Sequence, residues 1–282
     1  MHLKTRWTYK LLLGATALLL GAASQAATEN ECGPNAERIV QSAYPQAHKA
    51  DDGRYRLDHS IINLPNGTSL SGEPQAMVCR VWPAHPEKML VAVPLMNEVN
   101  RDGYSNNGDL ELLVLERDSL KVQQRLRLPR LMDDDAIRIE GIRFDTARYR
   151  LSTQDTAFGL NIYTEGDSRA NPYEDTTLRL YHIEGEHLAP VLDNVVVAEQ
   201  SGEWDTTCEG YFNKTKRTIA MATTRHHGLA DMLVTETRQH SVSKGDSQNC
   251  QTQDEPARIR KFTLTYDGST YNVPQALQRF GE

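Results

Sequence analysis

The sequence predicts an all-β protein, either an antiparallel sandwich or an irregular propeller-like domain, with one short helix near its N-terminus. Short apolar runs such as residues 110–115 and 158–163 recur along the chain, with turn-forming residues between them. The dipeptide Asp267-Gly268 lies between alternating apolar residues, a pattern typical of a type I′ hairpin across residues 262–271. No fixed repeat is visible, so the sequence does not indicate a regular propeller.

The expected helix covers residues 34–44. Pro34 and Asn35 suit the start of a helix, and Pro45 ends it. Almost everything after this point has the pattern of strand and turn. Strands are expected at residues 77–81, 89–93, 110–115, 122–128, 158–163, 178–183, 188–197, 217–223 and 232–235.

The first 26 residues have the three-part pattern of a secretory signal peptide. Three basic residues, Lys4, Arg6 and Lys10, precede a 13-residue apolar run and the small-x-small triplet that ends at Ala26. The apolar run is shorter than the roughly 20 residues needed to span a bilayer. We therefore expect residues 1–26 to be removed. Residues 27–282 would then form a single β-rich exported domain, with two β subdomains as the alternative.

The net charge is acidic and becomes more acidic after removal of the leader. The 282 residues contain 31 Lys and Arg against 38 Asp and Glu. Without the three basic leader residues, the balance is 28 against 38, a formal charge of −10. This balance argues against nucleic acid as a partner, because phosphate binding needs a basic surface. No later segment is apolar enough to span a membrane, so the sequence predicts a periplasmic or secreted protein.

The four cysteines agree with export. All of them lie after residue 26, at Cys32, Cys79, Cys208 and Cys250. An even number in an oxidising compartment predicts two disulfide bonds. Three pairings are open, and proximity in the sequence favours Cys32–Cys79 with Cys208–Cys250. The absence of a C-x-x-C motif argues against zinc.

Residues 98–109 resemble a calcium-binding loop. Oxygen-bearing side chains occupy positions 1, 3, 5, 9 and 12 of this stretch, with glycine at position 6. These candidate ligands are Glu98, Asn100, Asp102, Asn106 and Asp109. Arg101 within the loop opposes cation binding. The alternative is an ordinary polar turn, so calcium is a weak expectation and no other cofactor is expected.

Histidines form two further candidate sites. His226 and His227 precede Asp231, and either histidine with this carboxylate could act as a general base in a hydrolase. No motif for a catalytic nucleophile accompanies them, and a polar loop is the alternative. His182 and His187 flank Glu184-Gly185, so a two-residue turn there would place the two histidines opposite each other. They could then bind a metal ion as a pair, and the alternative is that they are solvated hairpin residues.

Three segments resemble uncharacterised exported proteins of proteobacteria: residues 168–173, 202–206 and 227–231. A fainter likeness is to the periplasmic inhibitors of invertebrate-type lysozyme. It rests on the acidic loop that leads into residues 109–114, on the export signal and on the β-rich pattern. Neither resemblance implies a catalytic residue or a binding residue at a particular position.

These observations predict an exported, disulfide-stabilised binding protein without catalytic activity. Its partner would be a protein or a glycan of the cell envelope. An inhibitor or immunity-type protein for a basic cell-envelope enzyme would fit the acidic charge, because opposite charges accelerate association. The alternatives are a periplasmic hydrolase that uses a histidine and a carboxylate, and a calcium-stabilised structural module.

Overall fold

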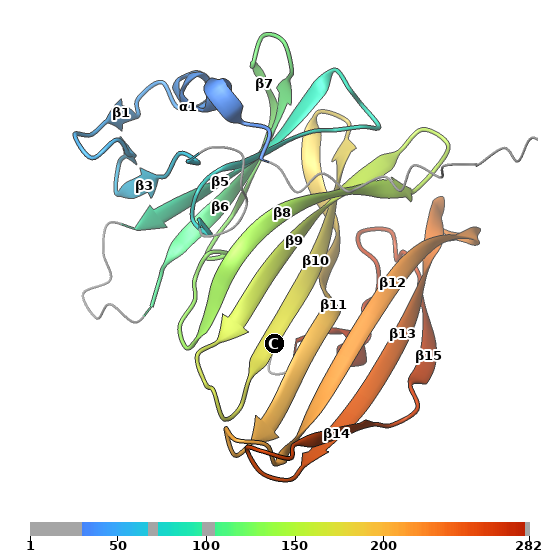
Figure 1. Ribbon diagram of the computed structural model, residues 1–282. Coiled ribbons are helices and arrows are strands. Elements are labelled where there is room, and N and C mark those ends of the chain that lie inside the picture. The colour runs from blue at the N-terminus through green and yellow to red at the C-terminus, as the bar shows by residue number, and fades with distance from the viewer. Residues whose placement is uncertain (1–29, 67–72, 98–104, 280–282) are drawn as a thin grey trace, which may run out of the picture.

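A computed structural model describes residues 30–66, 73–97 and 105–279 of the chain. Two antiparallel sheets pack as a sandwich that is not closed into a barrel, as Figure 1 shows. Strands make up 60% and helices 6% of the molecule, so the prediction of an all-β fold with one short helix is confirmed. Within the described ranges, every helix is too short or too polar to cross a membrane.

The smaller sheet has the strand order β1-β2-β3-β5-β6-β7, and β4 pairs with β5. Its strands are β1 (His48–Lys49), β2 (Tyr55–Leu57), β3 (Ser60–Ile62), β4 (Val78–Val81), β5 (Lys88–Asn97), β6 (Gly108–Glu116) and β7 (Val122–Leu128). The strands expected at residues 77–81 and 89–93 are present as β4 and β5, and they pair with each other antiparallel.

Strand β5 is apolar at nearly every position because both of its faces are buried. Met89, Val91 and Val93 belong to a core cluster on one face. Leu90 and Ala92 alternate with them and belong to the core between the two sheets. Successive side chains of a strand point to opposite faces, so burial on both sides leaves no polar alternation in the sequence.

The larger sheet has the order β14-β13-β12-β11-β10-β9-β8, and β15 pairs with β13. Its strands are β8 (Ile137–Arg150), β9 (Thr156–Gly166), β10 (Tyr173–Glu184), β11 (His187–Trp204), β12 (Gly210–His226), β13 (Leu229–Lys244), β14 (Gln251–Asp254) and β15 (Arg258–Leu264). Figure 1 shows that one end of β9 to β13 extends well beyond the smaller sheet.

Every second residue of β9 is buried in the core between the two sheets. Phe158, Leu160 and Ile162 are buried there, and the ring of Phe158 meets that of Trp82 edge-on at 5.1 Å. Residues 159, 161 and 163 point to the opposite face of the sheet, because side chains alternate along a strand. This second face of β9 carries the candidate site described below.

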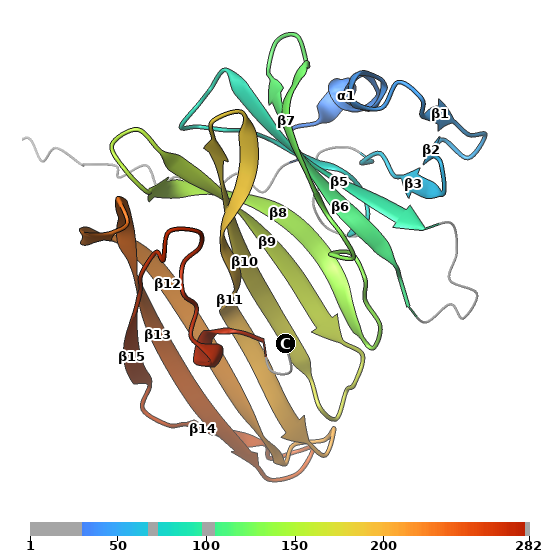
Figure 2. The same ribbon diagram turned by 180° about the vertical axis from the view of Figure 1, so that it is seen from behind.

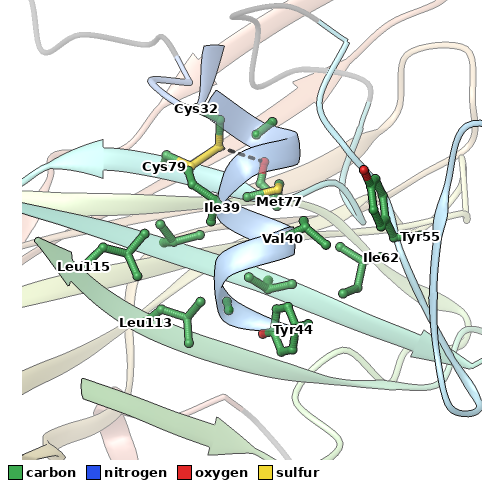
Figure 3. Close-up of a cluster of buried hydrophobic side chains, with 14 of the residues drawn as sticks. Cys32, Ile39, Val40, Tyr44, Tyr55, Ile62, Met77, Cys79, Leu113 and Leu115 are labelled. Atoms are coloured by element: carbon green, nitrogen blue, oxygen red, sulfur yellow. Dashed lines mark hydrogen bonds between the residues drawn. A yellow bond between two sulfur atoms is a disulfide. The ribbon is translucent and has the colours of Figure 1, made fainter. Parts of the chain in front are cut away.

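The N-terminal helix packs on the outer face of the smaller sheet. A 3-10 turn, η1 (Gly33–Asn35), leads into α1 (Ala36–Ala43). Ile39 and Val40 are fully buried against the sheet, and Figure 3 shows them among the other residues of this cluster. Figure 3 also shows the disulfide between Cys32 and Cys79 near the start of the helix.

The chain forms two disulfides, Cys32–Cys79 and Cys208–Cys250. This is the pairing that proximity in the sequence favours. The described residues contain no unpaired cysteine.

The segment after β15 covers one face of the larger sheet. Its 3-10 turn η2 (Gln275–Leu277) lies in front of that sheet in Figure 2. Nearby, Arg279 donates to the carboxylate of Asp175 at 2.7 Å and to the hydroxyl of Thr164 at 3.1 Å. Because neighbouring side chains alternate, Glu174 and Glu165 point to the face that this segment leaves uncovered.

The hairpin predicted around Asp267-Gly268 is only partly formed. Asp267 accepts a hydrogen bond from the backbone of Thr270, and Tyr266 and Tyr271 make an isolated bridge. The turn at Asp267-Gly268 was therefore predicted correctly. However, the strand that pairs with β15 is β13, not one that follows this turn.

Candidate binding site

The predicted histidine site is formed in part. Nδ1 of His226 lies 2.7 Å from Oδ1 of Asp231, and the hydroxyl of Thr224 donates to Oδ2 of the same carboxylate. Burial raises the pKa of Asp231, but the hydrogen bonds from Thr224 and His226 outweigh it and hold this pKa below its ordinary value. The carboxylate is buried, whereas the side chain of His226 is 54% exposed.

His227 takes no part in this arrangement. It occupies the first position of the two-residue turn between β12 and β13, with φ +48°, and Gly228 follows with φ +87°. Positive φ values at both positions are those of a type I′ turn. Within the described ranges, His226 contacts only Asp231 by hydrogen bond or ion pair, so no nucleophilic side chain is engaged with it.

The predicted pairing of His182 with His187 is wrong. Glu184 pairs with His187 across the β10–β11 hairpin, so the turn is formed by Gly185 and Glu186, one position later than expected. Gly185 has φ +61°, which glycine adopts at little cost. His182 is instead buried, and its Nδ1 lies 2.6 Å from Oδ2 of Asp155.

Three of the calcium candidates, Glu98, Asn100 and Asp102, lie outside the described residues. The other two bond to side chains of the protein. Asn106 donates to Asp134 at 2.8 Å, and Asp109 accepts from Arg127 at 2.6 Å. In the part of the chain that the structure describes, no group of three or more His, Cys, Asp or Glu could hold a metal ion.

A polar hollow lies on the uncovered face of the larger sheet, at the end that extends beyond the smaller sheet. It consists of two adjoining depressions of about 730 and 460 Å³, which share Glu140, Glu165, Glu174, Gln200 and Lys214. Volumes of this size suit small-molecule ligands. The residues that line it include Glu140, Arg143, Asn161, Tyr163, Glu165, Glu174, Gln200, Lys214 and Lys216.

The strand register places these side chains in rows across the sheet. One row is Glu165, Glu174, Gln200 and Lys214, on β9, β10, β11 and β12; the next is Tyr163, Thr176, Ala198 and Lys216; a third contains Arg143 and Asn161, on β8 and β9. Directly paired residues share a face, so each row points into the same side of the sheet.

Asn161 is the most unusual residue of the hollow. It is 8% exposed, and its Oδ1 accepts no hydrogen bond from any described residue. Buried polar atoms are nearly always bonded, and an unsatisfied one lowers stability by about 1–3 kcal/mol. Asn161 therefore presents a buried acceptor to the hollow without a partner from the protein.

Opposite charges occupy different strands of the hollow. Glu165 and Glu174 are directly paired across β9 and β10, and Lys214 and Lys216 lie on β12. The side chain of Glu174 accepts a hydrogen bond from that of Gln200, but the side chains of Glu165 and of both lysines make no hydrogen bond or ion pair with a described residue. Two like charges directly opposite on neighbouring strands repel each other.

Aromatic side chains border the hollow. The guanidinium of Arg143 lies 5.4 Å from the ring centre of Tyr163 and donates to its hydroxyl. At the other end, Phe212 lines the larger depression, and its ring lies 6.1 Å from that of Trp204, whose Nε1 donates to the carbonyl of Arg169. These contacts orient the rings of Tyr163 and Phe212 at the two ends of the hollow.

No pattern in the sequence predicted this hollow as a whole. One signal was present, because β9 places Asn161, Tyr163 and Glu165 at every second position, in alternation with the buried residues Leu160, Ile162 and Thr164. That alternation marks a polar face on a buried strand. The contributions of β10, β11 and β12 depend on register, which has no local signal.

No family model, curated protein or solved structure matches this chain. The resemblances noted in the sequence therefore stay predictions.

Proposed function

We propose that this is an exported binding protein that holds a small polar ligand in the hollow of its larger sheet. The observation that carries the proposal is the unpartnered Oδ1 of Asn161, a buried residue that lines the smaller depression of that hollow. The two disulfides support the exported part of the proposal, because such bonds persist in oxidising compartments.

A ligand with N–H or O–H groups would relieve two unfavourable features of the empty site. It would donate to Oδ1 of Asn161, and it would interact with the unpaired charges of Glu165 and Lys214. Buried polar groups that lack partners favour ligands that supply them. The hollow holds no arrangement of nucleophile and base, so the proposed role is binding rather than catalysis.

Asn161→Leu should raise stability in the absence of ligand. Leucine has nearly the same size and removes an unsatisfied acceptor, so we expect the free energy of unfolding to rise by about 1 kcal/mol. The same substitution at Asn30 is the matched control. Asn30 is also buried, but it donates to Met77 and accepts from the backbone N–H groups of Cys32 and Cys79.

Asn30→Leu should therefore lower the free energy of unfolding by at least about 2 kcal/mol, because it leaves three partners unsatisfied. Urea unfolding of both variants measures the two changes. Equal destabilisation by both would mean that Asn161 is not an unsatisfied group.

The binding role itself is measured by thermal melting with a panel of short peptides, oligosaccharides and sugar phosphates. At least one compound should raise the melting temperature of the wild type and not that of Asn161→Leu.

A second candidate function, hydrolysis, is favoured by the contact between His226 and Asp231. A buried carboxylate on Nδ1 holds the ring so that Nε2 can accept a proton from water. Water would then be the nucleophile, since no described side chain contacts Nε2. This candidate ranks below binding because His226 does not line either depression of the hollow.

His226→Gln tests the hydrolase candidate. Loss of a general base should slow hydrolysis of a chromogenic ester such as p-nitrophenyl acetate by at least about 100-fold. His227→Ala is the control, because His227 lies in the adjacent turn and outside the pair. Equal rates for the wild type and both variants would exclude His226 as a catalytic base.

The narrower prediction of an inhibitor for a basic cell-envelope enzyme is based on the acidic charge after removal of the leader. Steering by opposite charge supports it in general terms. The hollow carries both signs of charge and adds no support for a basic protein partner.

A further inference from the structure

We infer that the ligand of the hollow is dipolar, an extended peptide-like molecule with an ammonium group at one end and a carboxylate at the other. The ammonium group would lie over Glu165 and Glu174, and the carboxylate over Lys214 and Lys216. This inference rests on the proposed function, because it assigns the chemistry of the ligand in that same hollow.

The acidic end is formed by strands β8 to β10. Glu165 and Glu174 face each other in direct register, and Glu140 lines both depressions beside them. Repulsion between the paired carboxylates is relieved when a cation lies between them. An ammonium group has three donors, so it can bond to several carboxylate oxygens at once.

The basic end is formed by strand β12. Lys214 and Lys216 lie two positions apart, so both side chains point to the same face. Neither has an acidic partner among the residues that the structure describes. A ligand carboxylate can therefore bond to both ammonium groups without displacing an existing ion pair.

The spacing between the two ends sets the length of the ligand. Glu174 and Lys214 lie in one row, separated by strand β11. Neighbouring strands are about 4.8 Å apart, so the two backbones are separated by about 10 Å. An extended chain advances about 3.3 Å per residue, so three residues cover this distance.

The mixture of charges excludes simpler ligands. A polyamine would place a cation against Lys214 and Lys216, and a polyanion would place negative charge against Glu165 and Glu174. Asn161 lies four residues before Glu165 on β9, about 13 Å along the strand. A side branch with an N–H group would be needed to reach its Oδ1, so the natural ligand is larger than the minimal dipolar unit.

Triglycine is the minimal probe, because its charged ends are one extended tripeptide apart. Calorimetric titration compares it with N-acetyl-triglycine, which lacks the ammonium group, and with triglycine amide, which lacks the carboxylate. We expect triglycine to bind to the wild type at least about 10-fold more tightly than either derivative, because each derivative loses one charged contact.

Two double variants locate the ends of the ligand. In Glu165→Gln/Glu174→Gln, triglycine and N-acetyl-triglycine should bind equally. In Lys214→Met/Lys216→Met, triglycine and triglycine amide should bind equally. Glu186→Gln and Lys121→Met are the matched controls, because both residues are exposed and lie outside the hollow. These two controls should keep the wild-type preference.

The results separate this inference from the proposed function. If the three peptides bind equally, or none binds, the dipolar ligand is wrong. The panel of peptides, oligosaccharides and sugar phosphates then decides whether the hollow binds anything. If one of these compounds raises the melting temperature of the wild type but not of Asn161→Leu, the hollow is a binding site for a ligand of different chemistry. If no compound of either set binds, both proposals are wrong.

Discussion

Glu236→Gln is expected to lower the free energy of unfolding by about 3–5 kcal/mol, one of the largest effects of any single substitution in this protein. Glu236 and Arg217 are paired directly across β13 and β12, and both side chains are almost completely buried. Nε of Arg217 donates to Oε2 of Glu236 at 2.9 Å. Removal of the carboxylate charge leaves the guanidinium buried without a counter-charge.

The effect should extend to the C-terminal segment. Arg217 also donates to the carbonyl of Val196 at 2.6 Å and to that of Ala276 at 3.1 Å. The guanidinium therefore joins β12, β11 and the segment around η2 at one point. When its counter-charge is lost, we expect the backbone amides of residues 275–277 to exchange with solvent faster in hydrogen-exchange measurements.

A double variant separates charge from packing. In Arg217→Met/Glu236→Leu no charge of this pair stays buried, and the summed volume is close to that of the wild type. A buried pair replaced by apolar residues is often neutral in stability. Urea unfolding should therefore show that the double variant is more stable than Glu236→Gln. If the double variant loses as much stability as the single one, shape and hydrogen bonding rather than charge stabilise this region.

The fold could be predicted from the sequence because its signals are local. Pro34 and Pro45 bound the helix, and the apolar runs of β4 and β5 are joined by a short proline-containing loop. Each of these features involves residues within about ten positions of each other. The same local information explains the misplaced β10–β11 turn, since Gly185 can occupy either the first or the second position of a two-residue turn.

The hollow could not be predicted because its face depends on long-range register. On β11, Ala198 pairs with Thr176, whereas Val196 pairs with Thr177, so Val197 is an extra residue in the ladder. A bulge of one residue exchanges the faces of the residues on either side of it. The sequence has no mark for this bulge. The row from Glu174 to Lys214 is therefore visible only in the folded molecule.

Removal of the Cys32–Cys79 disulfide in the variant Cys32→Ala/Cys79→Ala should also strongly destabilise the protein. The cysteines are 47 positions apart, so the loss of this cross-link costs about 4 kcal/mol from chain entropy alone. Both sulfur atoms are buried in the core beneath α1, beside Ile39 and Met77 in Figure 3. Their removal adds a loss of packing to the entropic effect.

The variant Cys208→Ala/Cys250→Ala is the matched comparison. Its cysteines are 42 positions apart, so the entropic effect is nearly the same, about 4 kcal/mol. Cys208 is buried, but Cys250 is exposed just before β14 and contributes little to a core. We therefore expect urea unfolding to show the smaller loss for this variant, and mild reduction to break this bond first. If Cys208→Ala/Cys250→Ala loses more stability, the packing of Cys32 and Cys79 beneath α1 contributes less to the free energy of unfolding than the packing around Cys208.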